Sequence, residues 1–199
     1  MKFLSAILLI LLGIFTLVIS NSNGQANGKT TNQHSNFTTP VFDKENNLIR
    51  PKGYREWVFV GSSLGLSYRA NVPQENQPVE EVYHNTYIAP NSYREFSRTG
   101  KFPEGTVLVL ELLTQEKKKE PGLQGSYEKD YIALEASVKD SKRFKDGWAY
   151  FSFDGENGQL LAKAKAIASE SCFACHDKKA ETDHVFTQFY PVLRAAKPK

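Results

Sequence analysis

Two cysteines and a histidine near the C-terminus have the spacing that holds a haem group covalently. Cys172, Cys175 and His176 form a Cys-x-x-Cys-His motif, the attachment signature of c-type haem. Residues three apart lie on one face of a helical turn, so both thiols can reach the two vinyl groups of one porphyrin. The next residue then places its imidazole under the iron. The motif therefore predicts a covalently attached haem c, with Cys172 and Cys175 as attachment points and His176 as the iron ligand.

Other uses of the two cysteines fit less well. A disulfide that stabilises an exported protein normally closes a much longer loop. A redox dithiol of the thioredoxin type usually opens a helix after a strand, whereas residues 158–170 are rich in helix formers and predict a helix that ends at the motif. A zinc site needs a fourth ligand, for which His184 is the nearest candidate.

The second axial position is open to several ligands. Met1 is the only methionine, and it lies in the segment expected to be removed on export, so the His/Met ligation of many electron carriers is excluded. His34 falls in a polar leader, and His184 follows His176 by only eight residues. His84, a lysine, a water molecule or an empty position remain.

The N-terminus has the layout of a secretory signal. Lys2 is followed by an apolar run to Ile19 and then by small and polar residues. We expect a signal peptide over residues 1–26, a flexible leader over 27–45 and one domain over 46–199, in a periplasmic protein. An uncleaved membrane anchor is the alternative, because the run nears the length of a membrane span. The net charge of +3, with no basic cluster interleaved with aromatic residues, excludes nucleic acid as a partner.

The remaining sequence predicts an α+β fold with a mostly antiparallel sheet and a few helices. Runs rich in β-branched and aromatic residues predict strands, and turn signals separate them. The predicted strands are 57–60, 82–88, 106–113, 130–138 and 147–153, and the predicted helices are 91–98, the stretch before Cys172, and 182–196. Lys117, Lys118 and Lys119 are interpreted as a solvated loop. Haem c would then be attached near the C-terminal helix.

Several long motifs in order carry a family resemblance. They are the segments 51–58, 99–107, 130–144, 172–176 and 183–194. From about Leu48 to Ala196 the chain resembles the cytochrome P-460 and cytochrome c′-β family. The resemblance implies a β-rich homodimer, a high-spin five-coordinate haem and binding of nitrogen oxides. A cytochrome is also considered as a redox partner.

The resemblance also divides the family by chemistry. Cytochromes P-460 oxidise hydroxylamine and carry a bond from a lysine amine to the porphyrin, whereas cytochromes c′-β lack that bond and bind nitric oxide in an apolar pocket. The lysine position matches Leu110 here, and a distal arginine position matches His84. Phe151 and Phe153 are expected to wall the haem. Glu135 is the candidate proton acceptor, and Glu170 is a weaker one.

Three functions follow from these expectations. The favoured one is binding of nitric oxide or a related small nitrogen oxide at an open or weakly ligated iron. The second is hydroxylamine oxidation, an oxidoreductase activity with His84 and Glu135 as candidate catalytic residues. The third is electron transfer with His176 and His84 as paired ligands. The sequence leaves open whether the protein is an enzyme.

Overall fold

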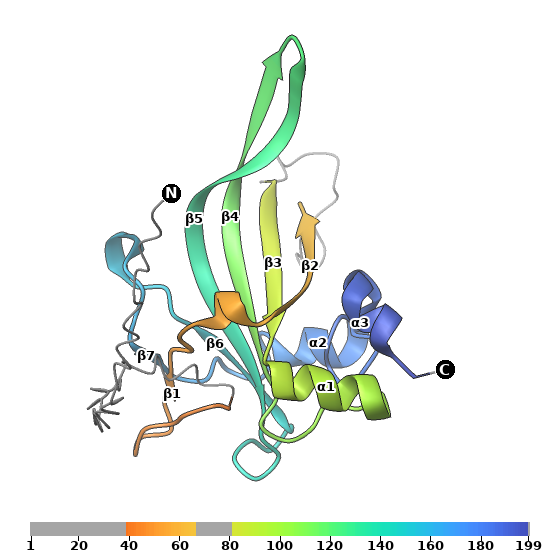
Figure 1. Ribbon diagram of the computed structural model, residues 1–199. Coiled ribbons are helices and arrows are strands. Elements are labelled where there is room, and N and C mark those ends of the chain that lie inside the picture. Colours follow the sequence, from red (N-terminus) through yellow and green to blue (C-terminus); the bar gives the residue numbers. More distant parts are fainter. Residues whose placement is uncertain (1–38, 67–80, 199) are drawn as a thin grey trace, which may run out of the picture. The chain divides into compact units, whose positions relative to one another are not determined.

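The computed structural model describes residues 39–66 and 81–198 (Figure 1). The predicted signal peptide and most of the predicted leader lie outside the described residues. Phe42, which falls within the predicted leader, packs against Phe144 and Phe151, so the folded region extends at least to this residue. Within the described ranges, no helix combines the length and the apolar character needed to span a bilayer.

A five-stranded antiparallel sheet forms the centre of the fold and confirms the predicted α+β class. Its strands run in the order β2-β3-β4-β5-β6. Their bounds are Val58–Leu64 for β2, Val82–Ile88 for β3, Val107–Glu120 for β4, Leu123–Lys139 for β5 and Trp148–Ser152 for β6. Two short strands, β1 (Leu48–Ile49) and β7 (Lys163–Ala164), pair separately.

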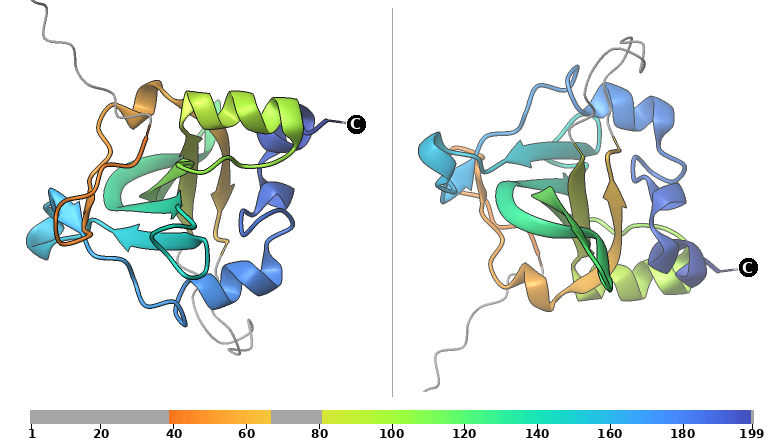
Figure 2. Two further views of the ribbon diagram at one scale, coloured as in Figure 1. Left: turned by 90° about the horizontal axis from the view of Figure 1, so that it is seen from below. Right: turned by 90° about the horizontal axis from the view of Figure 1, so that it is seen from above.

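Both faces of this sheet are covered, because successive side chains of a strand point to opposite sides. Val109, Leu134 and Phe151 belong to a core cluster with the N-terminal segment that contains β1. Leu108 and Tyr150, one residue away in each strand, belong to a second cluster that includes helix residues. Figure 2 shows α2 (Phe173–Lys179) and α3 (Pro191–Ala196) on one side of the sheet and β1 and β7 on the other.

Helix α1 (Pro90–Thr99) follows its sequence signals closely. Pro90 occupies the first turn, where a missing backbone N–H costs no hydrogen bond. Gly100 ends the helix with φ 71°, and its N–H donates to the Phe96 carbonyl at 2.7 Å. This left-handed position is the ordinary place for glycine after a helix.

The prediction of a helix before Cys172 is wrong. Residues 158–171 instead run through β7, which pairs with β1, and through Ile167, whose N–H donates to the Tyr150 carbonyl at 2.8 Å. Alanine and lysine favour a helix locally, but most helical stability in proteins comes from packing an apolar face. Most side chains of this stretch are exposed, so pairing with other strands decides its conformation.

The long helix predicted over 182–196 is replaced by shorter elements. A turn at residues 182–185 precedes a 3₁₀ turn at Thr187–Phe189, and α3 begins only at Pro191. Proline is tolerated in the first turn of a helix but breaks its interior, so the helix cannot extend back through Pro191. Asp183 and His184 also have positive φ, which no right-handed helix allows.

The predicted lysine loop is wrong as well, because Lys117 to Lys119 lie inside β4. They pair with residues 124–126 of β5 in a long hairpin that extends beyond the rest of the sheet (Figure 1). Lys117 and Lys118 form ion pairs with Glu81 and Glu120. The hairpin turns at Gly122, within the Pro121-Gly122 turn that the sequence predicts.

A buried carboxylate ties the N-terminal segment to the sheet on the face away from α2. Glu111 of β4 is 3% exposed. Its Oε1 accepts hydrogen bonds from the Tyr54 hydroxyl at 2.5 Å and from Arg55 Nε at 2.8 Å. Burial and the bond to Glu111 raise the pKa of Tyr54, so the phenol stays protonated and donates. These donors compensate the carboxylate for its lost water.

We expect Tyr54→Phe to lower the free energy of unfolding by about 1.5–3 kcal/mol, because a buried charged acceptor loses one donor. Urea denaturation checks this. Tyr127→Phe is the matched control, because Tyr127 is 40% exposed at the hairpin and its loss should leave stability unchanged. Equal losses in the two variants would contradict the assignment.

Candidate functional site

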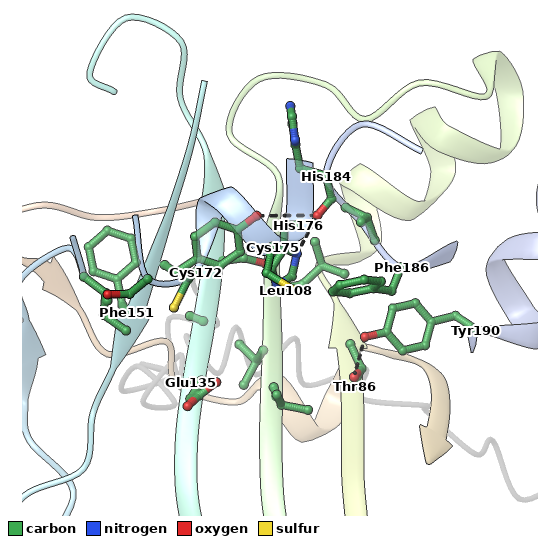
Figure 3. A pocket seen from close by; sticks show the side chains of 18 residues that line it. Thr86, Leu108, Glu135, Phe151, Cys172, Cys175, His176, His184, Phe186 and Tyr190 are labelled. Carbon is green, nitrogen blue, oxygen red and sulfur yellow. Dashed lines mark hydrogen bonds between the residues drawn. The ribbon is translucent and has the colours of Figure 1, made fainter. Parts of the chain in front are cut away.

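A cavity of about 250 Å³ lies between the α2 side of the sheet and the C-terminal segment (Figure 3). The sheet wall comes from strands β3 to β6, and the other wall comes from residues 167–190. The sheet residues whose side chains share the α2 face are Thr86, Leu108, Leu110, Glu135, Ser137 and Tyr150. The C-terminal residues are Ile167, Ser171, Cys172, Cys175, His176, His184, Val185, Phe186 and Tyr190.

The motif cysteines both line this cavity. Cys172 caps the start of α2 and Cys175 lies in its first turn, where the Cys175 and His176 N–H groups donate to the Cys172 carbonyl at 3.2 and 3.1 Å. Figure 3 shows the Cys172 sulfur directed toward the sheet wall that carries Glu135. Burial raises the pKa of Cys172. A reactive dithiol needs a thiol whose pKa is lowered, so this environment does not favour the redox-dithiol alternative.

His176 is held in one tautomer and one orientation. Its Nδ1 donates a hydrogen bond to the His184 backbone carbonyl at 2.7 Å. Its ring packs between Tyr150 and Phe186, at centroid distances of 4.3 and 4.5 Å. Because Nδ1 carries the proton, Nε2 holds the lone pair that a metal needs. Burial also lowers the pKa of His176, which favours the neutral imidazole.

These residues fit a c-type haem. Two thiols and one neutral imidazole line a single cavity, and the imidazole carries the backbone hydrogen bond that usually orients a metal-ligating histidine. Aromatic and aliphatic side chains form much of the remaining wall, as an apolar cofactor requires. Within the described ranges, no three His, Cys, Asp or Glu side chains are grouped closely enough to hold a metal ion together.

One row across the sheet gives the cavity its polar and apolar character. Thr86, Leu110 and Glu135 are directly paired across β3, β4 and β5, so their side chains lie side by side on one face. Leu110 presents an apolar side chain at the position where the family's lysine is expected. Burial, and to a lesser extent Asp154, raises the pKa of Glu135.

The other predicted site residues are placed differently. Phe151 borders the cavity, but the side chains of both Phe151 and Phe153 belong to the core cluster on the opposite face of the sheet. His84 does not line the cavity: its side chain is half-buried, with Nδ1 3.5 Å from the Ser63 hydroxyl. Burial lowers the pKa of His84. Glu170 is exposed just before the motif.

Several cavity residues escaped the sequence reasoning. Tyr150 and Phe186 enclose the His176 ring, and the Tyr190 hydroxyl lies 3.3 Å from the Thr86 hydroxyl. Alternation along β6 already places Tyr150 on the face opposite Phe151. Pairing β6 with β5, the strand that carries Glu135, would therefore have identified Tyr150 as a cavity residue. Phe186 and Tyr190 follow the turn at residues 182–185, and no local pattern predicts where that turn directs them.

His184 lies beside the motif histidine rather than across the cavity from it. Its imidazole packs against Phe173 at a centroid distance of 4.7 Å. Figure 3 shows the ring directed away from Glu135 and Thr86. Its backbone, not its side chain, therefore serves the site.

Comparison with proteins of curated function finds no match. Comparison with family models finds one, described as Cytochrome P460, over residues 51–187. The matched segment includes the five-stranded sheet, both cysteines and His176. Since it spans more than half of the 199 residues, it confirms the resemblance inferred from the motifs. The chain belongs to the cytochrome P460 family and is a haem c cytochrome.

Proposed function

We propose that this protein is an exported monohaem cytochrome that binds nitric oxide or a related small nitrogen oxide. Cys172 and Cys175 would hold the haem through thioether bonds, and His176 would be its protein ligand. The observation that carries the proposal is the sheet wall of the cavity, where Leu108 and Leu110 present no ligating atom. A haem bound there would receive no ligand from these two side chains, which would leave one coordination position of its iron open.

The cavity wall explains the choice of ligand. Water binds well only where several polar partners hold it, whereas a neutral diatomic molecule needs few. Leu110 faces the cavity between Thr86 and Glu135, and Leu108 lies one step further along β4 on the same side. This apolar part of the wall offers a bound water few polar partners and so favours an uncharged ligand.

Paired histidine ligation finds little support in the placement of His84. His84 lies two residues beyond Thr86 on β3, which is roughly 7 Å further along the strand. Within the described part of the chain, His184 is the other histidine at the cavity, and its ring packs on Phe173. We therefore propose an open rather than a bis-histidine site.

The wider setting of the protein is also proposed. The apolar N-terminal run supports export to the periplasm by a signal peptide, with an uncleaved anchor as the alternative. A homodimer is proposed from the resemblance alone, and a cytochrome is proposed as the redox partner of a haem protein of this kind.

Glu135 supports hydroxylamine oxidation as a second candidate. This reaction needs a group that accepts protons as electrons leave the substrate. Glu135 lines the cavity with its pKa raised, which makes its carboxylate a stronger base than an exposed glutamate. The objection is Leu110, which has no amine to form the bond that the resemblance associates with this activity.

Replacing both cysteines tests the attachment. We expect Cys172→Ala/Cys175→Ala to lose all covalently bound haem, because the chain has only two cysteines. Haem staining after denaturing electrophoresis measures it. Ser171→Ala, a neighbouring cavity residue, should retain full staining. Staining that persists in the double variant would overturn the assignment.

Nitric oxide binding tests the open site. The reduced protein should bind nitric oxide, and Leu110→Gln should slow binding by roughly 3- to 30-fold, because an amide holds a water whose displacement costs up to ~2 kcal/mol. Stopped-flow absorbance measures the rate. Leu112→Gln is the matched control, since Leu112 pairs with His84 outside the cavity and should leave the rate unchanged.

Two results would contradict an open site. One is a reduced spectrum that neither nitric oxide nor carbon monoxide perturbs. The other is a low-spin ferric spectrum that becomes high-spin in His84→Ala, which would establish bis-histidine ligation and electron transfer instead.

Glu135→Gln separates the two candidate functions. If the protein oxidises hydroxylamine, turnover with an electron acceptor should fall about 100-fold or more in this variant, while nitric oxide binding is retained. The wild-type rate should rise with pH through the raised pKa of Glu135, above the usual value of 4.5, because only the ionised carboxylate accepts a proton. Glu170→Gln, at an exposed position, is the control. Wild-type turnover no greater than that of free haem would remove this candidate.

A further inference from the structure

The turn that hydrogen-bonds to His176 has an unusual backbone. The Val185 N–H donates to the Thr182 carbonyl at 2.9 Å, and the two residues between them, Asp183 and His184, have φ values of 48° and 61°. Positive φ at both central positions defines a type I′ turn, whose second central residue is normally glycine. A histidine there is strained, and such strain persists only where surrounding contacts hold it.

One set of contacts ties the turn to the sheet through Asp183. Its Oδ1 accepts a hydrogen bond from Trp148 Nε1 at 3.1 Å, and its Oδ2 accepts one from Lys139 Nζ at 2.7 Å. Lys139 Nζ also donates to the Phe102 carbonyl at 2.9 Å, so its position is fixed from two sides. The Asp183 and Lys139 side chains are only 31% and 18% exposed, which limits screening of their ion pair by water.

A second set of contacts ties the same turn to α2 through His184. Its ring packs on Phe173, which lies between the two motif cysteines in the sequence. Its Nδ1 lies 3.7 Å from Asp177 Oδ1. Between these two anchors, the His184 carbonyl accepts from His176 Nδ1 at 2.7 Å and lies 3.5 Å from the Tyr150 hydroxyl (Figure 3). The turn therefore bridges the sheet and α2 at the carbonyl that His176 contacts.

We infer that Asp183 is a positioning residue that sets the donor strength of His176 toward the iron. Asp183 fixes the turn, and the turn fixes the His184 carbonyl. This carbonyl accepts the hydrogen bond from His176 Nδ1. A stronger bond at Nδ1 makes the imidazole a more basic ligand, which stabilises ferric over ferrous iron. The inference rests on the proposed role of His176 as the iron ligand.

Asp183→Asn tests this in the haem-loaded protein. The amide keeps an oxygen for Trp148 but removes the charge that holds Lys139, so the turn loosens and the bond from His176 weakens. The iron–histidine stretching band of the ferrous protein, read by resonance Raman, should move to lower frequency. The equilibrium constant for reduction of the iron should rise about tenfold, which raises the reduction potential by roughly 59 mV for one electron.

Two further variants make the result decisive. Lys139→Met removes the same ion pair from the other side and should shift band and potential in the same direction. Asp43→Asn is the matched control: its carboxylate also accepts from a lysine, Lys163 at 2.6 Å, but it does so beside β1, and both readings should equal the wild type.

The outcomes separate this inference from the proposed function. The proposed ligation itself would be overturned if the wild type shows no iron–histidine band, or if the band persists in His176→Gly. A band that is present in the wild type and unchanged in both Asp183→Asn and Lys139→Met would overturn only the role of Asp183. If Asp183→Asn fails to fold, Lys139→Met alone decides.

Discussion

The antiparallel register of β3, β4 and β5 is the constraint on which the rest of the structure depends. It pairs Thr86 with Leu110 and Leu110 with Glu135, and so assembles one wall of the cavity from three strands. A slip of one residue would send these side chains to the other face, because the side-chain period of a strand is two. Apolar side chains are buried on both faces, so such a slip would also disrupt both core clusters.

The sheet and the C-terminal segment contribute different parts of the cavity. The sheet supplies the wall that would face a bound ligand, while α2 supplies the thiols and the imidazole. Tyr150 links the two, because it extends from β6 and packs on the His176 ring at 4.3 Å. A change at Leu110 would therefore alter this wall without touching the two cysteines or His176.

What the sequence predicts depends on how local the cause is. Spacing alone singles out Cys172, Cys175 and His176, which the structure places at one cavity, and side-chain type and turn signals predict the strands. The segment before Cys172 is mispredicted because alanine and lysine favour a helix locally, whereas pairing of β7 with β1 decides its conformation. The bond from His176 to the His184 carbonyl has no local signal, because it depends on a turn held by Trp148, 35 residues away from Asp183.

The orientation of His176 likewise depends on contacts distant in sequence rather than on its own helix. A side chain on a seven-residue helix with no buried residue cannot rely on that helix for a fixed orientation. The rigid part of the protein nearby is the sheet, where Trp148 is 3% exposed. Asp183 transfers that rigidity to the turn, and the turn transfers it to the imidazole through one backbone carbonyl. The positive φ angles of Asp183 and His184 belong to the turn that places this carbonyl at Nδ1, and the contacts of the turn hold them.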